Sequence, residues 1–364
     1  MPLNPSGAIS LAGPVAGQSI AVELGQSATA TISLNDTNVR TLAQKPSGVI
    51  VMPTDFYGKS NFVNTQRAIF GFGFVGPAYT NATNLVSSTG VMASDTPGVG
   101  TPRGNLAAST YGGDKAIFGL GFITAQTAIT SLVSNTGVVA ADTPGAPGVL
   151  ARSGVAAAGY GSSGQAIFGF GSIPSPVRRQ NRTNLVSNTG VMAADTPGVG
   201  TPRTTLAAAS YGGDKAIFGF GQAPATVSVT NLVSNTGVVA TDTPGVGTVR
   251  NEPGAANYGG DKAIFGFGAG APGVGPISST CLVSNTGVVA ADTPGAPGVL
   301  ARQQLGAAGY GNDKAIFGFG NRPNPSVRQN ITNLVSNTGV VASDTPGVGT
   351  AREALAAAGY SLTA

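Results

Sequence analysis

The chain has 364 residues, of which only 9% are charged, and a formal net charge of +4. It contains one cysteine and no histidine, which excludes an intrachain disulfide, histidine-dependent nucleophilic catalysis and histidine-built zinc or copper sites. No Lys/Arg run is dense enough for a nucleic-acid patch, while abundant glycine (56) and proline (24) suit many short strands joined by tight turns.

Residues 1–64 precede a repeated region and differ from it. Their first part, MPLNPSGAISLAG, lacks the basic and continuous apolar regions of a secretion signal. No stretch of the chain approaches the ~20 apolar residues that span a bilayer, so we expect no membrane insertion. We therefore expect synthesis in the cytoplasm without secretory export.

Within this first segment, residues 18–34 alternate apolar and polar positions and predict one or two strands. Asn35 or Asp36 can cap a short helix over residues 37–43. Because a chain of ~60 residues buries little surface, we expect the segment to be ordered by oligomerisation or by docking on a partner protein. A floppy leader is the alternative.

A segment of about fifty residues recurs through residues 65–364 and is the main evidence on the fold. Its most regular element is IFGFG, which reads IFGLG in the second copy. Each copy is followed by LVSNTGV or LVSSTGV, an Asp-Thr-Pro-Gly turn, an arginine, an alanine-rich run and a tyrosine. The six copies begin at Ile69, Ile117, Ile167, Ile217, Ile264 and Ile316.

Each repeat is predicted to contain four short strands and no helix. The segments between them, Gly-Gly-Asp-Lys, Thr-Gly and Asp-Thr-Pro-Gly, supply residues that tolerate positive φ or fix φ in tight turns. Four short strands in about 40–50 residues is the pattern of a β-propeller blade. Around the fourth IFGFG, the predicted strands cover residues 206–212, 216–221, 230–235 and 238–242.

The AIFGFG strand is suited to stacking of blades. Alternation along a strand places Phe218 and Phe220 on one face, and Ile217, Gly219 and Gly221 on the other. Phenyl rings of one blade can then pack against the glycine-lined face of the next. The alanine-rich strand is expected innermost, where the sheets converge and only small side chains fit.

The two ends of the repeated region complement each other. The first IFGFG has no alanine-rich strand before it, whereas the last repeat ends in such a run, at residues 355–360. Pairing of this strand with the first blade closes the array and removes its exposed edges. We therefore predict an all-β protein, a six-bladed β-propeller of four-stranded blades over residues 65–364 that the C-terminal strand closes, with a small separate segment at residues 1–64.

Aspartate and arginine recur once per repeat, on either side of the Pro-Gly turn, eight residues apart in four repeats and ten in two. We interpret them as structural salt bridges within or between blades, because symmetric repetition spreads the acids around the ring, whereas a hydrolase needs two together. A repeated calcium site is the alternative, but neighbouring ligands are sparse, and we expect no metal and no cofactor. The pairs are Asp95 and Arg103, Asp142 and Arg152, Asp195 and Arg203, Asp242 and Arg250, Asp292 and Arg302, and Asp344 and Arg352.

The segment between IFGFG and LVSNTG differs in every repeat, while the flanking sequence barely changes. Variable loops on one side of a constant scaffold are the arrangement expected of a recognition surface, and neutral variation in tolerant loops is the alternative. Two loops are basic and one carries a tyrosine, so an acidic surface polysaccharide or a neighbouring protein could bind there. The candidate binding residues are Tyr79, Arg178, Arg179, Arg182, Arg322 and Arg328.

The order of arginine, small-residue strand, glycine-ended apolar strand and proline-containing turn resembles the kelch repeat. Gly-Phe-Gly replaces the kelch double glycine, and the kelch tryptophan is missing. In wording, NLVSNTGVVA, DTPGVGT and KAIFGFG are similar to arrays in bacteriophage virion proteins, especially those of cyanobacterial phages. Residues 32–60, ISLNDTNVRTLAQKPSGVIVMPTDFYGKS, resemble a short region at the front of phage tail and fibre proteins.

These resemblances imply a structural protein of a phage tail, a fibre or baseplate component of the virion. They imply that residues 1–64 attach to other tail proteins and that the propeller contacts host surface glycan or a neighbouring tail protein. Fibres are commonly trimers, so a homotrimer is the favoured oligomer. A lectin-like adhesin outside a virion and a polysaccharide-degrading propeller enzyme are the alternatives, but the absent histidines and the symmetric acids favour a protein that is not an enzyme.

Overall fold

The chain divides into two compact units, Met1–Asn64 and Thr65–Ala364, and each is described by itself. The division falls where the repeats begin. The computed structural model describes residues 3, 6–15, 18–43, 48–56, 66–174, 178–323 and 325–362.

The first unit contains two short α-helices, α1 (Ile20–Glu23) and α2 (Thr37–Leu42). Helix α2 confirms the predicted helix. The strands predicted over residues 18–34 are wrong, because the chain turns into α1 there. Ser19 caps this helix by accepting a hydrogen bond from the amide N–H of Val22 at 3.3 Å.

The first unit has a small apolar core of its own. Helix α2 and the 3-10 turn η1 (Thr54–Phe56) bring Val39, Leu42 and Phe56 together with Ile20 of α1. All four side chains are almost fully buried. The described residues therefore form a folded unit, which does not fit the floppy-leader alternative. Its docking on a partner stays a prediction.

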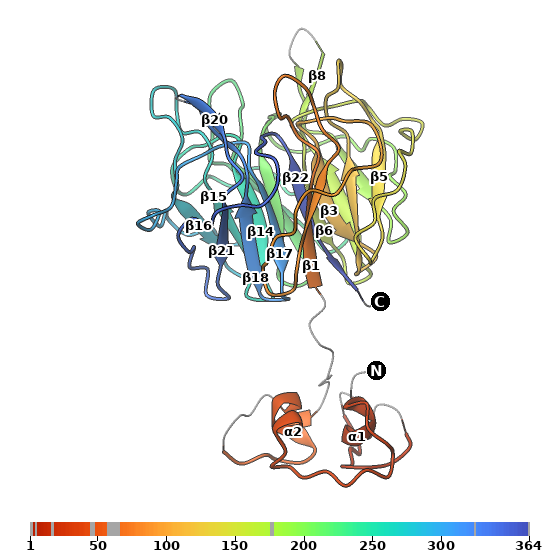
Figure 1. The fold of residues 1–364 in the computed structure, drawn as a ribbon. Coiled ribbons are helices and arrows are strands. Elements are labelled where there is room, and N and C mark those ends of the chain that lie inside the picture. The colour runs from red at the N-terminus through yellow and green to blue at the C-terminus, as the bar shows by residue number, and fades with distance from the viewer. Residues whose placement is uncertain are drawn as a thin grey trace. The chain divides into compact units, whose positions relative to one another are not determined.

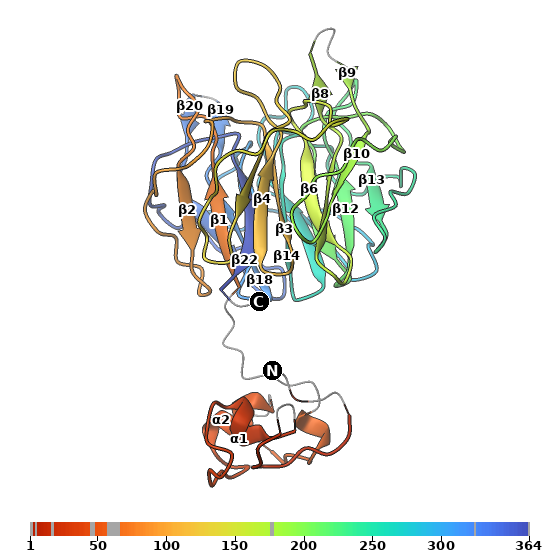
Figure 2. The same ribbon diagram turned by 90° about the vertical axis from the view of Figure 1, so that its right-hand side faces the viewer.

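The described part of the second unit is all-β, with six three-stranded antiparallel sheets and two small hairpins (Figures 1 and 2). In each sheet the alanine-rich strand pairs with the IFGFG strand, which pairs in turn with the strand that begins at a threonine. We name the sheets A to F. Their strands are, for sheet A, β22 (Ala356–Ser361), β1 (Gln66–Gly71) and β2 (Thr83–Val86); for B, β3 (Ala107–Tyr111), β4 (Lys115–Gly119) and β5 (Thr130–Val133); for C, β6 (Ala156–Tyr160), β7 (Gln165–Gly169) and β10 (Thr183–Val186); for D, β11 (Ala207–Tyr211), β12 (Lys215–Gly219) and β13 (Thr230–Val233); for E, β14 (Gly254–Tyr258), β15 (Lys262–Gly266) and β16 (Thr280–Val283); and for F, β17 (Gly306–Tyr310), β18 (Lys314–Gly318) and β21 (Thr332–Val335).

The fourth strand predicted for each repeat is not formed in the described sheets. After β13 the chain returns to sheet D only at isolated bridges, between Val233 and Val239 and between Thr230 and Thr243. Pro244 follows at once, and proline has no N–H to continue a ladder. The prediction of four-stranded sheets is therefore corrected to three strands and an irregular outer segment.

Strands from opposite ends of the repeated region make up sheet A, as predicted. β22 pairs with β1 in a continuous register that runs from Gln66 opposite Ser361 to Gly71 opposite Ala356. The alanine-rich strands contact one another in the cyclic order β3, β6, β11, β14, β17, β22 and again β3. Their small side chains line a cavity of about 50 Å³, which agrees with the innermost position predicted for them.

The two aromatic residues of IFGFG face opposite neighbours. Strand β12 ends at Gly219, and Phe220 follows with a φ of 64°. Phe218 therefore packs between sheets C and D with Phe170, whereas Phe220 packs between sheets D and E with Phe265. The prediction that both rings share one face is wrong, because it assumed an extended backbone through the second phenylalanine.

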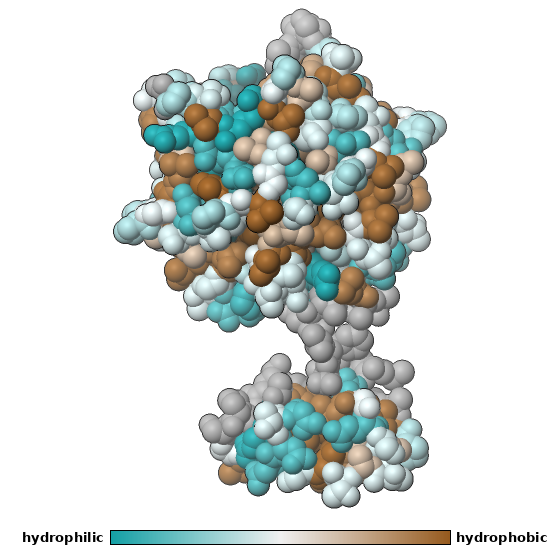
Figure 3. All heavy atoms as spheres, in the orientation of Figure 1, coloured by the Kyte–Doolittle hydropathy of each residue, from teal (hydrophilic) through white to brown (hydrophobic). Residues whose placement is uncertain are grey.

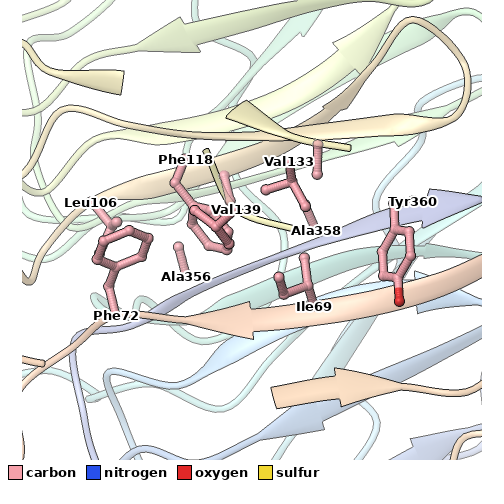
Figure 4. Packing of buried hydrophobic residues seen from close by; sticks show 11 residues of the cluster. Ile69, Phe72, Leu106, Phe118, Val133, Val139, Ala356, Ala358 and Tyr360 are labelled. Carbon is pink, nitrogen blue, oxygen red and sulfur yellow. The ribbon is translucent and has the colours of Figure 1, made fainter. Parts of the chain in front are cut away.

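The predicted packing of phenyl rings on glycine is confirmed for the first ring of the motif. Phe218 lies against Gly169 of sheet C, where an added Cβ atom would be only 2.9 Å from the ring. Figure 4 shows the equivalent core between sheets A and B, with Phe72, Leu106 and Phe118 close together. The rings of Phe72 and Phe118 have centroids 5.1 Å apart. Contacts of this kind hold neighbouring sheets face to face.

Main-chain hydrogen bonds also join neighbouring sheets, in two sets. In the first set, the residue two positions before each alanine-rich strand has a positive φ, and its N–H donates to the carbonyl oxygen of its counterpart in the preceding sheet. Six such bonds, with N···O distances of 2.7–3.2 Å, form a closed cycle. We call these six residues the inner ring: Asn105, Gly154, Thr205, Glu252, Gln304 and Ala354.

The second set lies at the opposite end of the sheets, where hairpins join the first and second strands. The N–H of Gly212 in the sheet D hairpin donates to the carbonyl oxygen of Asp261 in the sheet E hairpin at 2.6 Å. Sheet A has two chain segments in place of a hairpin. There Gly311 donates to Gln66, and the N–H of Ser361 donates to Asp114. Both segments therefore take part in the second cycle.

Candidate functional site

The variable segments leave one end of their sheets. Each connects the end of a second strand with the start of a third, and antiparallel pairing places these positions side by side, as for Gly219 opposite Thr230. Figures 1 and 2 show the two small hairpins projecting from this end. We call the surface formed by their described residues the loop face. It comprises residues 74–82, 122–129, 172–182, 222–229, 269–279 and 321–331.

The two projecting hairpins lie on sheets C and F, three positions apart in the cyclic order and thus across the cavity from each other. Residues 132–152 and 282–302, which lead into these sheets, are identical in sequence. Sheets A to C and sheets D to F of the second unit are therefore related by an approximate twofold repetition. The hairpins consist of β8 (Ser172–Ile173) and β9 (Arg178–Arg179), and of β19 (Asn321–Pro323) and β20 (Ser326–Arg328).

Tyr79 is packed into the loop face rather than presented from it. Its ring lies 5.2 Å from the ring of Phe74 and 6.2 Å from that of Phe122, measured between centroids. Gly104 leaves room for it, since a Cβ atom there would lie 2.6 Å from the tyrosine ring. Burial raises the pKa of Tyr79. A structural role accounts for these contacts, and ligand binding by Tyr79 stays a prediction.

The hairpin on sheet F carries one engaged and one exposed arginine. The guanidinium of Arg328 pairs with Glu353 at 3.0 Å and lies 4.7 Å above the ring of Phe74. Arg322, on β19, is exposed. The structure therefore places the two predicted residues in different environments, with only Arg322 free to meet a ligand.

The described arginines at the hairpin on sheet C have fewer close partners than Arg328 on sheet F. Arg182 is 49% exposed, and its guanidinium lies 3.7 Å from the carboxylate of Asp195. The Nε–H of Arg179 is buried and has no hydrogen-bond partner among the described residues. Arg178 is part of β9, but its side chain lies outside the described part of the chain.

The recurrent aspartates and arginines form a buried network behind the loop face. Four arginines pair with the aspartate of their own sheet, which comes 39 or 42 residues later, and Arg352 pairs with Asp95 of sheet A. None of these five pairs with the aspartate eight or ten residues earlier. The predicted partners are therefore corrected. The arginine precedes the first strand of a sheet, and the aspartate follows the third. The N···O distances are 3.3 Å for Arg103 and Asp142, 3.5 Å for Arg203 and Asp242, 2.7 Å for Arg250 and Asp292, 3.9 Å for Arg302 and Asp344, and 3.5 Å for Arg352 and Asp95.

Sheet C departs from this pattern. Arg152 hydrogen-bonds to Asn184 and to the carbonyl oxygen of Arg182, and no described carboxylate lies within ion-pair distance of it. Arg182 takes the place beside Asp195 instead. Burial lowers the pKa of Arg152 to about 10, the negative charge of Asp195 opposes this shift, and the positive charge of Arg182 adds to it. Two guanidinium groups therefore depend on one carboxylate in this sheet.

Five of the six buried arginines also link their sheets to the preceding ones. The guanidinium of Arg103 lies 4.2 Å above the ring of Phe72, the positive-φ aromatic residue of sheet A, and Arg203 lies 4.4 Å above Phe170. Such cation–π contacts add to the ion pairs. Leu120 takes the aromatic position opposite Arg152, because the second motif reads IFGLG.

An asparagine that our sequence analysis did not single out completes the network. In sheet D, the side-chain amide of Asn231 donates to Asp242 at 2.8 Å and to the carbonyl oxygen of Ala240 at 3.0 Å, while its oxygen accepts from Arg203. The recurrent Asn of TNLV was the available signal. Sheet B has serine and sheet E has Cys281 at this position.

Cys281 is buried within the network of sheet E. Its thiol donates to Asp292 at 2.8 Å, and Arg250 approaches the sulfur at 3.6 Å. Burial, aided by the bond to Asp292, raises the pKa of the thiol to about 12. The thiolate is therefore not available as a nucleophile near neutral pH.

In the part of the chain that the structure describes, no group of three or more cysteine, aspartate and glutamate side chains could hold a metal ion. No described helix is long and apolar enough to cross a membrane. No family model and no curated protein matches the sequence.

On the face of the molecule seen in Figure 3, hydrophobic residues lie in small patches among hydrophilic residues.

Proposed function

We propose that the second unit is a six-bladed β-propeller. We propose that it is a non-enzymatic scaffold that presents the loop face for recognition. The observation that carries the proposal is cyclic connection. The inner ring passes through all six sheets, and sheet A joins strands from both ends of the repeated region. Blades arranged around an axis account for both features, with three regular strands and an irregular outer segment in each blade.

The constancy of the buried network beside the variety of the loops supports a recognition role. The arginine and aspartate positions are filled in the same way in five sheets, and their side chains are engaged with each other. The loops above them differ in length and charge. A rigid scaffold with variable loops is how binding surfaces are commonly built. The recurrent acids support the fold, which favours binding over hydrolysis.

We further propose that the protein is a tail-associated component of a phage virion, since its repeats and residues 32–60 resemble such proteins. In this proposal the first unit attaches to other tail proteins, the chain assembles as a homo-oligomer, with a trimer favoured, and the loop face meets a host surface glycan or a neighbouring tail protein. The first unit has a folded core that includes Ile20, Val39 and Phe56. A folded unit presents a fixed surface to a partner, which supports the attachment role.

Incubation of the full chain with purified bacterial surface polysaccharides tests the recognition role. Retention of polysaccharide on the immobilised protein, with its chain length unchanged by size-exclusion chromatography, is expected. Shortening of the polysaccharide would show an enzyme and overturn the proposal. Failure to retain any polysaccharide or any tail protein would overturn the recognition role as well.

Deletion of residues 353–364 tests the cyclic fold. It removes β22 and leaves β1 without its partner, so we expect loss of cooperative unfolding and aggregation through the exposed edge. Deletion of residues 1–64, which leaves the six sheets complete, is the control, and its melting transition should persist. A soluble, cooperatively folded chain without β22 would contradict the propeller.

A further inference from the structure

The hairpins on sheets C and F allow a comparison at equivalent positions. Arg179 in the segment RQN of sheet C corresponds to Arg328 in RQN of sheet F. Each side chain has an Nε–H that is buried and without a hydrogen-bond partner. The two sites therefore share an arginine whose Nε–H is buried and unpartnered, within the same local sequence.

Their neighbours differ in charge. Arg328 is neutralised by Glu353 at 3.0 Å and stacked on Phe74. The residues in the corresponding positions of sheet D, next to the hairpin of sheet C, are the neutral Thr204 and Gln222. No described carboxylate pairs with Arg179. The sheet C hairpin thus keeps the cation of this motif and lacks the counter-ion.

A second guanidinium adds to this positive charge. Arg182 replaces the isoleucine found at position 331 of the other hairpin. Its nearest carboxylate, Asp195, lies 3.7 Å away and already accepts hydrogen bonds from Asn184 at 2.8 Å and from the N–H of Leu150 at 3.2 Å. The charge of Asp195 also acts on the buried Arg152, so this one carboxylate serves two guanidinium groups.

We propose that Arg179 and Arg182 form an anion-binding site on the loop face, and that its ligand is an acidic polysaccharide. Planar guanidinium groups bind carboxylates and sulfates through paired, charge-assisted hydrogen bonds. A carboxylate or sulfate of the ligand would accept hydrogen bonds from the guanidinium N–H groups. It would also supply the negative charge that Glu353 supplies to Arg328 at the other hairpin. This assignment deepens the proposed recognition function and depends on it.

The other side chains of the site favour a glycan over other polyanions. The neighbouring positions Asn181, Thr204 and Gln222 are polar and uncharged, and Asn181 and Thr204 donate to the carbonyl oxygens of Gly200 and Gly154. None of these is aromatic, whereas single-stranded nucleic acids are bound by stacking on aromatic rings. Protein partners are anchored mainly by buried aromatic side chains and arginine in apolar pockets, which these residues do not supply.

Titration of the full chain with oligogalacturonate at low salt tests the site. The double variant R179Q/R182Q should bind about tenfold or more weakly, because it removes both cations. The variant Lys314→Gln removes an exposed cation in the hairpin between β17 and β18, away from the loop face, and should bind within about twofold of the wild type. Equal binding by R179Q/R182Q and wild type, or an equal loss in Lys314→Gln, overturns the site.

Exchange of the counter-ion gives a sharper test. Thr204→Glu places a carboxylate where Glu353 lies relative to Arg328, and should weaken oligogalacturonate binding to the level of R179Q/R182Q. Glu353→Thr frees Arg328 and should create a second, weaker site. Unchanged binding in Thr204→Glu overturns the role of Arg179. Melting temperatures near that of the wild type verify that each variant is folded.

Two further probes test the ligand class. Neutral maltooligosaccharide should not bind, and polyglutamate of equal charge should bind more weakly than oligogalacturonate. Polyglutamate binding as tight as that of oligogalacturonate overturns the assignment to a glycan. If R179Q/R182Q still retains the bacterial polysaccharide that the wild type retains, this site is wrong while the recognition role of the propeller stands.

Discussion

Arg352 and Asp95 lie 257 residues apart in the sequence and form an ion pair with an N···O distance of 3.5 Å. Arg352 precedes β22, and Asp95 follows β2, so the pair spans sheet A between the two ends of the repeated region. Thr350 also donates its hydroxyl to Asp95 at 2.6 Å. The ion pair found within four other sheets therefore joins the two ends of the repeated region here.

Replacement of Asp95 by alanine should lower the free energy of unfolding by about 1–3 kcal/mol, because it leaves the fully buried Arg352 guanidinium without a carboxylate. This is below the value for a fully buried pair because Asp95 is 27% exposed. Urea unfolding followed by circular dichroism measures the change. Asp313→Ala, which removes the exposed pair with Lys314, is the control and should have no measurable effect. Equal losses in the two variants would contradict the assignment.

The stability of the protein should fall at acid pH through these aspartates. Burial by itself raises the pKa of Asp95, but hydrogen bonds from Thr350 and Asn84 and the charge of Arg352 outweigh it, and the pKa lies below its usual value. A carboxylate of this kind stabilises the fold above its unfolded-state pKa, near 3.9, and loses that contribution as the pH falls through its folded-state pKa. Unfolding at a series of pH values should show the loss below about pH 4. Retention of full stability at pH 2 would contradict it.

Glu252 should act in the opposite direction. Burial raises its pKa, despite a hydrogen bond from Gln304 at 2.8 Å. Such a group destabilises the fold where it is ionised, and this cost disappears as the pH falls through its folded-state pKa. Glu252→Gln should therefore be more stable than the wild type at pH 8, and the difference should vanish below about pH 4. Glu353→Gln, which loses the ion pair with Arg328, should be less stable at pH 8.

Replacement of Cys281 by asparagine should stabilise sheet E by about 1 kcal/mol. Asparagine at this position in sheet D bridges Arg203, Asp242 and a main-chain carbonyl group, whereas the thiol reaches fewer partners. Thermal unfolding measures the gain, and Cys281→Ala should lose stability. A decrease in stability of the asparagine variant would show that the sheet E site has adapted to the smaller side chain.

Replacement of Thr205 by glycine should stabilise the inner ring by about 0.5–1 kcal/mol. Thr205 has a φ of 52°, a region that β-branched residues rarely adopt, and Gly154 fills the equivalent position in sheet C with a φ of 63°. Chemical denaturation measures the change. Thr230→Gly, in the regular strand β13, is the control and should be destabilising. The idea fails if both substitutions destabilise alike.

The strands and the joining of the two ends could be predicted because they depend on local pattern. The alanine-rich run at residues 355–360 lacked a following IFGFG, and only sheet A lacked such a strand. The reversal at Phe220 could not be predicted, since nothing in the residue type indicates a positive φ at a phenylalanine.

The ion-pair partners of the arginines in the candidate site could not be predicted from the sequence either. Proximity in sequence favoured Asp142 with Arg152, but Asp142 pairs with Arg103, because the strand after each arginine joins the next sheet. The sequence could locate the basic loops, yet it could not separate Arg328 from Arg179. Their difference depends on Glu353, which leads into the first strand of another sheet, sheet A.

The inner ring is built from main-chain atoms alone. Its six positions carry six different amino acids, and each contributes one N–H and one carbonyl group to its neighbours. Cohesion of this kind does not depend on side-chain identity. Proteins built on this fold can therefore vary the side chains of the inner ring and the loops next to it. The main-chain geometry that joins neighbouring sheets stays the same.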